Sequence, residues 1–179
     1  MYLKGGSTIS IDIGIASKSI IEYMLSLERE FLKDVTYNIT KDFGYSGFIV
    51  EDCTPWNEKL LSFGELSLFK VKKANNSSSN LHLSIEFINK REKGIKCFIG
   101  EKDFKEKKIA QNITNSFKDL GFLDLGIKYS DVYIITNTTM PLIILKIYCN
   151  ILEFERDKER LIPSLSKTLV KSIISLGTI

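Results

Sequence analysis

The sequence is poor in the residues that bind metals and form crosslinks. Its 179 residues include one histidine, His82, and three cysteines, Cys53, Cys97 and Cys149. The cysteines are widely spaced, each in an apolar run, and there is no CxxC pair or Cys/His cluster. This pattern favours buried free thiols over a disulfide framework, and it offers no structural zinc site.

Membrane and export signals are also lacking. No segment approaches the roughly 18 apolar residues of a membrane span. Residues 1–14 have no apolar core and no small-residue cleavage site, so the sequence predicts a cytoplasmic protein. The net charge is only +3, with lysines and glutamates interspersed, which argues against a nucleic-acid partner.

Strand-like apolar runs alternate with helical patterns along the chain. We expect strands at residues 9–14, 48–53, 81–87, 94–99, 132–136 and 142–148, and helices at 20–43, 58–74, 104–120 and 164–176. This alternation predicts one α/β domain over the whole chain, with a mostly parallel central sheet of about six strands and helices on both faces. Near-continuous apolar character further predicts that both sides are buried in the strands containing Ile11, Ile49, Ile85, Ile134 and Ile144.

Four short motifs occur along these elements in a fixed order. They are residues 12–15 (DIGI), 30–34 (EFLKD), 84–87 (SIEF, after an Ala-Asn pair that ends a helix) and 141–146 (PLIILK). In order and spacing they resemble the D-P-G-H, E-x-x-x-N, S-I-H-F and P-x-x-L-x-E motifs of the zinc-dependent N-acetylmuramoyl-L-alanine amidases. Residues 50–54 (VEDCT) are similar to a V-D-C-T run in clostridial phage endolysins of this class. The resemblance covers nearly the whole chain, although the second motif can also be aligned two residues earlier, on Glu28.

The resemblance implies that the functional positions are changed. In the family, the His of the first and third motifs and the Glu of the second bind zinc, and the Glu of the fourth is the catalytic acid/base. Here Ile15 and Glu86 stand at the two His positions, Glu30 is kept, and Lys146 replaces the catalytic Glu. An Ile has no lone pair, and two carboxylates without an imidazole make a poor zinc site. We therefore expect no catalytic residue, no zinc and no other cofactor.

The charged residues at these positions predict a metal-free arrangement. Lys146 could supply the missing positive charge in a cluster with Glu30 and Glu86 inside the former pocket. The alternative is that Lys146 and Glu86 reach solvent from an open cleft. If the cluster is buried, Lys146→Ala should cost roughly 3–5 kcal/mol of stability. His82 cannot replace a ligand easily, because it precedes Glu86 by roughly 13 Å along the same strand face.

Two classes of function follow from the resemblance. The favoured one is a catalytically inactive relative of the amidases that acts as a binding or interaction module, with a peptidoglycan fragment or an unknown protein as its partner. The alternative is a peptidoglycan amidase that keeps its activity through a displaced or altered metal site. We expect no separate cell-wall-binding domain, and a cytoplasmic chain would need release by a holin-type protein to reach the cell wall.

Overall fold

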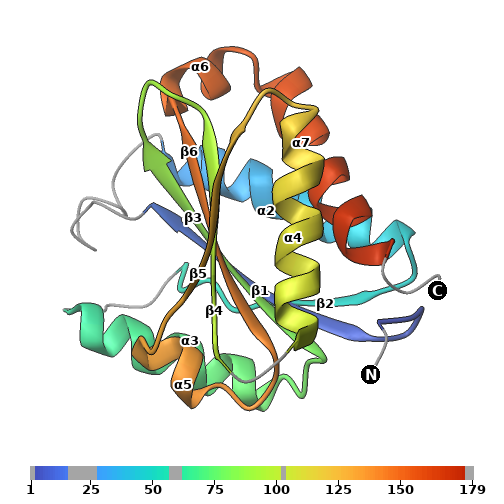
Figure 1. Ribbon diagram of the computed structural model, residues 1–179, viewed down its shortest axis with the longest axis vertical. Coiled ribbons are helices and arrows are strands. Elements are labelled where there is room, and N and C mark those ends of the chain that lie inside the picture. Colours follow the sequence, from blue (N-terminus) through green and yellow to red (C-terminus); the bar gives the residue numbers. More distant parts are fainter. Residues whose placement is uncertain (1–2, 16–27, 57–61, 102–103, 176–179) are drawn as a thin grey trace.

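A six-stranded sheet forms the centre of the structure (Figure 1). The structure is a computed structural model that describes residues 3–15, 28–56, 62–101 and 104–175. The strand order is β2-β1-β3-β6-β4-β5, and neighbouring strands are parallel except for β4 and β6. The strands are β1 (Thr8–Ile15), β2 (Ile49–Asp52), β3 (Leu81–Asn89), β4 (Gly94–Ile99), β5 (Leu123–Tyr129) and β6 (Leu142–Cys149). The predicted α/β fold with a mostly parallel sheet is confirmed.

Helices lie on both sides of this sheet (Figure 1). They are α2 (Glu28–Tyr45), α3 (Phe63–Asn76), α4 (Phe104–Lys118), α5 (Tyr133–Asn137), α6 (Ile151–Arg156) and α7 (Lys158–Ile174). Helices α2, α4 and α7 pack together on one side, where the ring of Phe31 in α2 meets Phe87 edge-on at a centroid distance of 5.0 Å. Helices α3 and α5 pack together on the other side, where Lys70 of α3 reaches Asp12 of β1.

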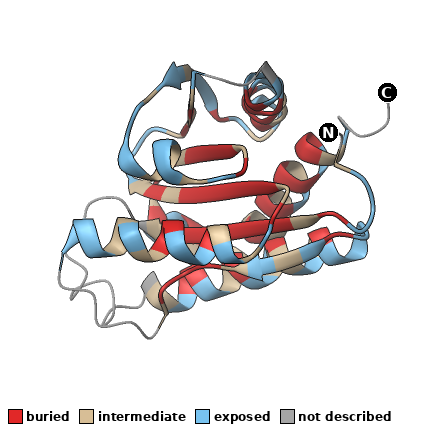
Figure 2. Cartoon of the chain, turned by 90° about the horizontal axis from the view of Figure 1, so that it is seen from below, coloured by how far each residue is buried: buried red, intermediate tan, exposed pale blue. Residues whose placement is uncertain are grey.

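The two faces of the sheet differ in character because side chains alternate along a strand. Odd-numbered residues from Ile9 to Ile13, Leu81 to Phe87 and Ile143 to Cys149 are apolar and buried, and they form the main core. We call the opposite side the polar face, since its even-numbered positions include Ser10, Asp12, His82, Ser84, Glu86 and Lys146. Figure 2 shows that buried residues concentrate in the strands and in the helix sides that face them.

The polar face is covered over only part of its length. Ser10, Asp12, His82 and Ser84 are fully buried, and we call this the covered half. Further along β3 and β6, at Glu86, Ile88, Lys146 and Tyr148, the side chains are only half-buried, and we call this the open half. In the antiparallel neighbour β4, Lys96 lies opposite Lys146 and therefore belongs to the open half. The open half contains two of the positions that the motifs single out.

Two expectations about strands are wrong. Residues 132–136 do not form a strand: Tyr133–Asn137 is the short helix α5, and the sixth strand is β5. A β-branched run forms a strand only where a hydrogen-bonding partner is free, and β5 already occupies the edge beside β4. The strand β5 was not predicted because Gly126 interrupts its apolar pattern. Gly126 has a positive φ of +85° and lies where the register between β5 and β4 shifts. Ile49 is 55% exposed because β2 is the opposite edge strand, and Ile134 in α5 is only half-buried.

The cysteines follow the prediction. Cys53, Cys97 and Cys149 are buried and free. Burial raises the pKa of each thiol to about 12, so none is a reactive thiolate at neutral pH. No helix within the described ranges is long and apolar enough to cross a membrane.

Candidate functional site

Glu86 and Lys146 form an ion pair in the open half of the polar face. Parallel pairing of β3 and β6 places the two residues directly opposite each other. The Lys146 Nζ lies 3.1 Å from Glu86 Oε2, and 29% of the Lys146 side chain and 26% of the Glu86 side chain remain exposed. The ammonium of Lys146 also lies 5.2 Å from the ring centre of Phe98 in β4, close enough for a cation–π contact. The pair is thus held by the register of three adjacent strands.

The structure does not bring Glu30 into this pair. Glu30 lies in the first turns of α2, and its side chain is 70% exposed. Its carboxylate is 3.8 Å from Lys33 Nζ on the same helix. Helix α2 packs on the apolar side of the sheet, whereas Glu86 and Lys146 belong to the polar face, so the sheet separates the two sets of charges. The expected three-residue cluster is therefore corrected to the pair Glu86–Lys146.

Ile15 ends β1 next to this site. Gly14 is in register with Glu86, and the backbone of Ile15 is in register with Phe87, one residue further along. The side chains of Ile15 and Glu28 lie outside the described part of the structure. Whether Ile15 points toward Glu86 thus stays a prediction from the motif alignment.

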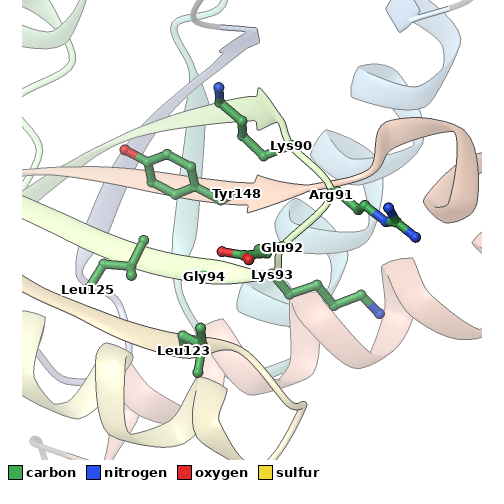
Figure 3. A pocket seen from close by; sticks show the side chains of 8 residues that line it. All are labelled: Lys90, Arg91, Glu92, Lys93, Gly94, Leu123, Leu125 and Tyr148. Carbon is green, nitrogen blue, oxygen red and sulfur yellow. The ribbon is translucent and has the colours of Figure 1, made fainter.

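A shallow hollow of about 380 Å³ lies at the same end of the sheet (Figure 3). Its walls include Tyr148 of β6, Gly94 of β4, and Leu123 and Leu125 of β5. In Figure 3 the side chain of Lys93 points away from Tyr148, and its ammonium lies 5.9 Å from the ring centre of Phe154 in α6. Lys90, Arg91 and Glu92, from the turn between β3 and β4, complete the lining, so the hollow has both apolar and charged walls.

This protein resembles known proteins in its fold but not detectably in its sequence. No protein-family model matches the sequence, and no curated protein is significantly similar to it. Solved structures, in contrast, match nearly the whole chain. The catalytic domain of the CD27L endolysin targeting Clostridia difficile has a TM-score of 0.75 and 15% identity, covering 97% of this chain and 99% of that one.

Two further matches are bacterial enzymes. The N-acetylmuramoyl-L-alanine amidase from Clostridium difficile 630 has a TM-score of 0.71 and 16% identity, with 96% of this chain and 97% of that chain covered. The CwlD amidase from Clostridioides difficile, solved in complex with the GerS lipoprotein, has a TM-score of 0.64 and 16% identity, with 96% of each chain covered. The fold is that of the N-acetylmuramoyl-L-alanine amidases. At these identities the amidase structures establish the architecture, and the chemistry depends on the residues of this chain.

The described residues do not fit the zinc ion of an amidase. The Glu86 carboxylate is bound by an ammonium group, and Glu30 is exposed and paired with Lys33. Among the described residues, no three His, Cys, Asp or Glu side chains come together in a way that could hold a metal ion. The ammonium of Lys146, 3.1 Å from the Glu86 carboxylate, also opposes a divalent metal electrostatically. This chain therefore has the amidase fold, but an ion pair between Glu86 and Lys146 occupies two positions that the motif alignment assigns to the zinc site and the catalytic residue.

A buried polar network fills the covered half, and we did not predict it from the sequence. Asp12 Oδ2 lies 2.8 Å from His82 Nε2, and Asp12 Oδ1 lies 2.5 Å from Lys70 Nζ. The hydroxyl of Ser84 donates to Asp12 Oδ1 at 3.0 Å, and Ser10 Oγ lies 2.8 Å from His82 Nδ1. Burial by itself would raise the pKa of Asp12. The charge of Lys70 and the hydrogen bond and charge of His82 outweigh this effect and lower the pKa from 3.8 to about 2. Asp12 is therefore an ionised carboxylate inside the protein.

The order Ser10–His82–Asp12 resembles a hydrolytic triad, but its position argues for a structural role. All three side chains have no exposed surface, so no substrate can reach the Ser10 hydroxyl. A buried charge needs a partner and full hydrogen bonding, and here Lys70, His82 and Ser84 provide both. The signal in the sequence was the spacing of Ser10 and Asp12 on one strand and of His82 and Ser84 on another, each pair at alternate positions in apolar surroundings.

Proposed function

We propose that this protein is a non-catalytic relative of the zinc N-acetylmuramoyl-L-alanine amidases that acts as a binding or interaction module. The observation that carries the proposal is the ion pair between Lys146 and Glu86. The motif alignment puts the catalytic Glu and a zinc-binding His of the amidases at these positions. An ammonium group cannot act as a general base while ionised, and it repels a divalent metal. The protein therefore binds no stoichiometric zinc and does not cleave muramoyl-alanine bonds.

The proposed ligand is a peptidoglycan fragment or a protein partner. The fold supports the first, because the matching structures include an N-acetylmuramoyl-L-alanine amidase and the catalytic domain of an endolysin. The complex of the CwlD amidase with the GerS lipoprotein supports the second, since it is a protein partner of a domain with this fold. Binding of a soluble muropeptide, measured by calorimetry, tests the first directly.

Metal content and wall hydrolysis test the loss of chemistry. After purification from zinc-rich medium, we expect far less than one zinc ion per chain by elemental analysis, because Lys146 opposes the metal. We also expect no clearing in a wall-turbidity assay in which an active amidase of the same fold serves as the positive control. Clearing that a chelator abolishes would contradict the proposal and favour an amidase with a displaced metal site.

Restoring the family residues tests the alignment that underlies the proposal. The triple change Ile15→His, Glu86→His and Lys146→Glu should create measurable zinc affinity, because it supplies two imidazoles and removes the opposing charge. A matched control replaces the same three residues with Gln. If both variants bind zinc equally, or if neither binds it, these three positions do not converge on one site.

A further inference from the structure

We propose that the open half of the polar face binds a doubly charged anionic group, a phosphate or two adjacent carboxylates, through Lys96 and Lys128 beside the Glu86–Lys146 pair. This inference rests on the proposed function in one respect, since it gives the binding module the chemical class of its ligand. It requires neither peptidoglycan nor zinc, so it can be tested separately.

The first step is the arrangement of three lysines on adjacent strands. Lys96 of β4 lies opposite Lys146 of β6 in the antiparallel register, and Lys128 of β5 lies opposite Phe98 of β4. The ammonium groups of Lys96 and Lys146 are 5.7 and 5.2 Å from the ring centre of Phe98. The ammonium groups of Lys96 and Lys146 therefore flank one aromatic ring, and the exposed Lys128 extends from the adjacent strand in register with that ring.

The second step is the charge balance of this group. Glu86 neutralises Lys146, whereas within the described parts of the chain neither Lys96 nor Lys128 takes part in an ion pair. Like charges facing each other across a sheet are unfavourable. Partial burial lowers the pKa of Lys96, and the nearby charges of Lys128 and Lys146 lower it further. Two positive charges thus lack an anion here, and a bound dianion would supply it.

The third step is the hollow beside the lysines. Gly94 and Lys96 are successive positions of one strand face, as are Lys146 and Tyr148, so the hollow adjoins the cationic group directly. A Cβ at position 94 would lie 2.7 Å from Leu125 Cδ1, which shows how closely the glycine backbone and this leucine approach. The site therefore has two parts, a cationic part for the anionic group and the adjoining hollow for the rest of the ligand. The hollow is lined by Leu123, Leu125 and Tyr148 and by the charged residues 90–93 of the turn between β3 and β4, of which Glu92 is acidic.

The direct measurement is the pKa of Lys96 in the wild-type protein. We expect inorganic phosphate to raise this pKa toward its ordinary value, because a bound anion stabilises the charged ammonium. The pKa is followed by NMR of methyl-labelled lysines, with chloride at equal ionic strength as the reference. Equal pKa values in phosphate and in chloride would overturn the proposal, and this readout needs no variant that might fail to fold.

Charge-matched variants locate the site. The double variant Lys96→Met and Lys128→Met should weaken phosphate binding by about tenfold or more, because each lost charge-assisted contact contributes on the order of a tenfold change. The control is Lys107→Met with Lys108→Met, two exposed lysines of α4, which changes the net charge equally and should leave affinity within about twofold. Equal weakening in both double variants would mean a general charge effect and would refute a site.

Two probes distinguish the source of the anion. Phosphate and glutarate are titrated separately into the wild-type protein by calorimetry at fixed ionic strength. Preference for phosphate assigns a phosphorylated ligand, preference for glutarate assigns a ligand with paired carboxylates, and binding of neither overturns the proposal. Anion binding without muropeptide binding would keep this site while rejecting peptidoglycan as the partner.

Discussion

The covered and open halves of the polar face contain similar charged groups in different surroundings. In the covered half, the carboxylate of Asp12 has no exposed surface and contacts Lys70, His82 and Ser84. In the open half, about a quarter of the Glu86 side chain is exposed, and its carboxylate pairs with Lys146 alone among the described ion pairs. The covered half compensates its charge internally and contributes to stability. In the open half, Lys96 and Lys128 have no counter-ion among the described residues, and the proposed anion site rests on this difference.

The largest effect should come from removing the cation in the covered half. Lys70→Met leaves the buried Asp12 carboxylate without its ammonium partner, and we expect a loss of roughly 3–5 kcal/mol in the free energy of unfolding. Urea denaturation measures it, with Lys72→Met, an exposed lysine of the same helix, as the control. Adding Asp12→Asn to Lys70→Met should recover much of the loss. If the two single lysine variants are equally stable, the contrast between the halves is wrong.

The next effect is the response of stability to acid. The pKa of Asp12 is lowered from 3.8 to about 2 in the folded protein, so its contribution is fully present above pH 3.8 and is lost as the pH falls toward about 2. The total change is about 2 kcal/mol for a shift of this size. Urea unfolding at a series of pH values should show a steeper loss for the wild type than for the Asp12→Asn, Lys70→Met double variant. If the free energy of unfolding falls with pH equally in the two proteins, Asp12 is not the cause of the acid sensitivity.

The smallest effect should come from the open half. Because the side chains of Lys146 and Glu86 are partly solvated, we expect Lys146→Ala to cost about 1 kcal/mol or less, in place of the larger value expected for a buried cluster. Lys118→Ala, which breaks the exposed pair of Lys118 with Asp124 at 3.2 Å, is a matched control. A loss as large as that of Lys70→Met would show that the open half is also a closed structural network.

Much of the fold could be predicted from the sequence because the relevant signals are local. Periodicity over a few residues identified five of the six strands and the layered α/β class. Order and spacing of the motifs also placed Glu86 and Lys146 on adjacent parallel strands, where they are in register. The exceptions are where a local signal is ambiguous: β5, whose apolar pattern is interrupted by Gly126, was not predicted as a strand, and the β-branched run before Asn137 was predicted as one.

The sequence by itself determined the strand and helix pattern, the alternation of apolar and polar positions, and the identity of the residues at the former catalytic positions. Only the tertiary structure decided which charges meet across the fold: Lys70, from a separate helix, pairs with Asp12, and the described residues provide no counter-ion for Lys96 and Lys128. The reason is physical. Secondary structure and side-chain alternation depend on neighbours in sequence, whereas burial and ion pairing depend on which segments pack over each part of the sheet, and that is set by the whole fold.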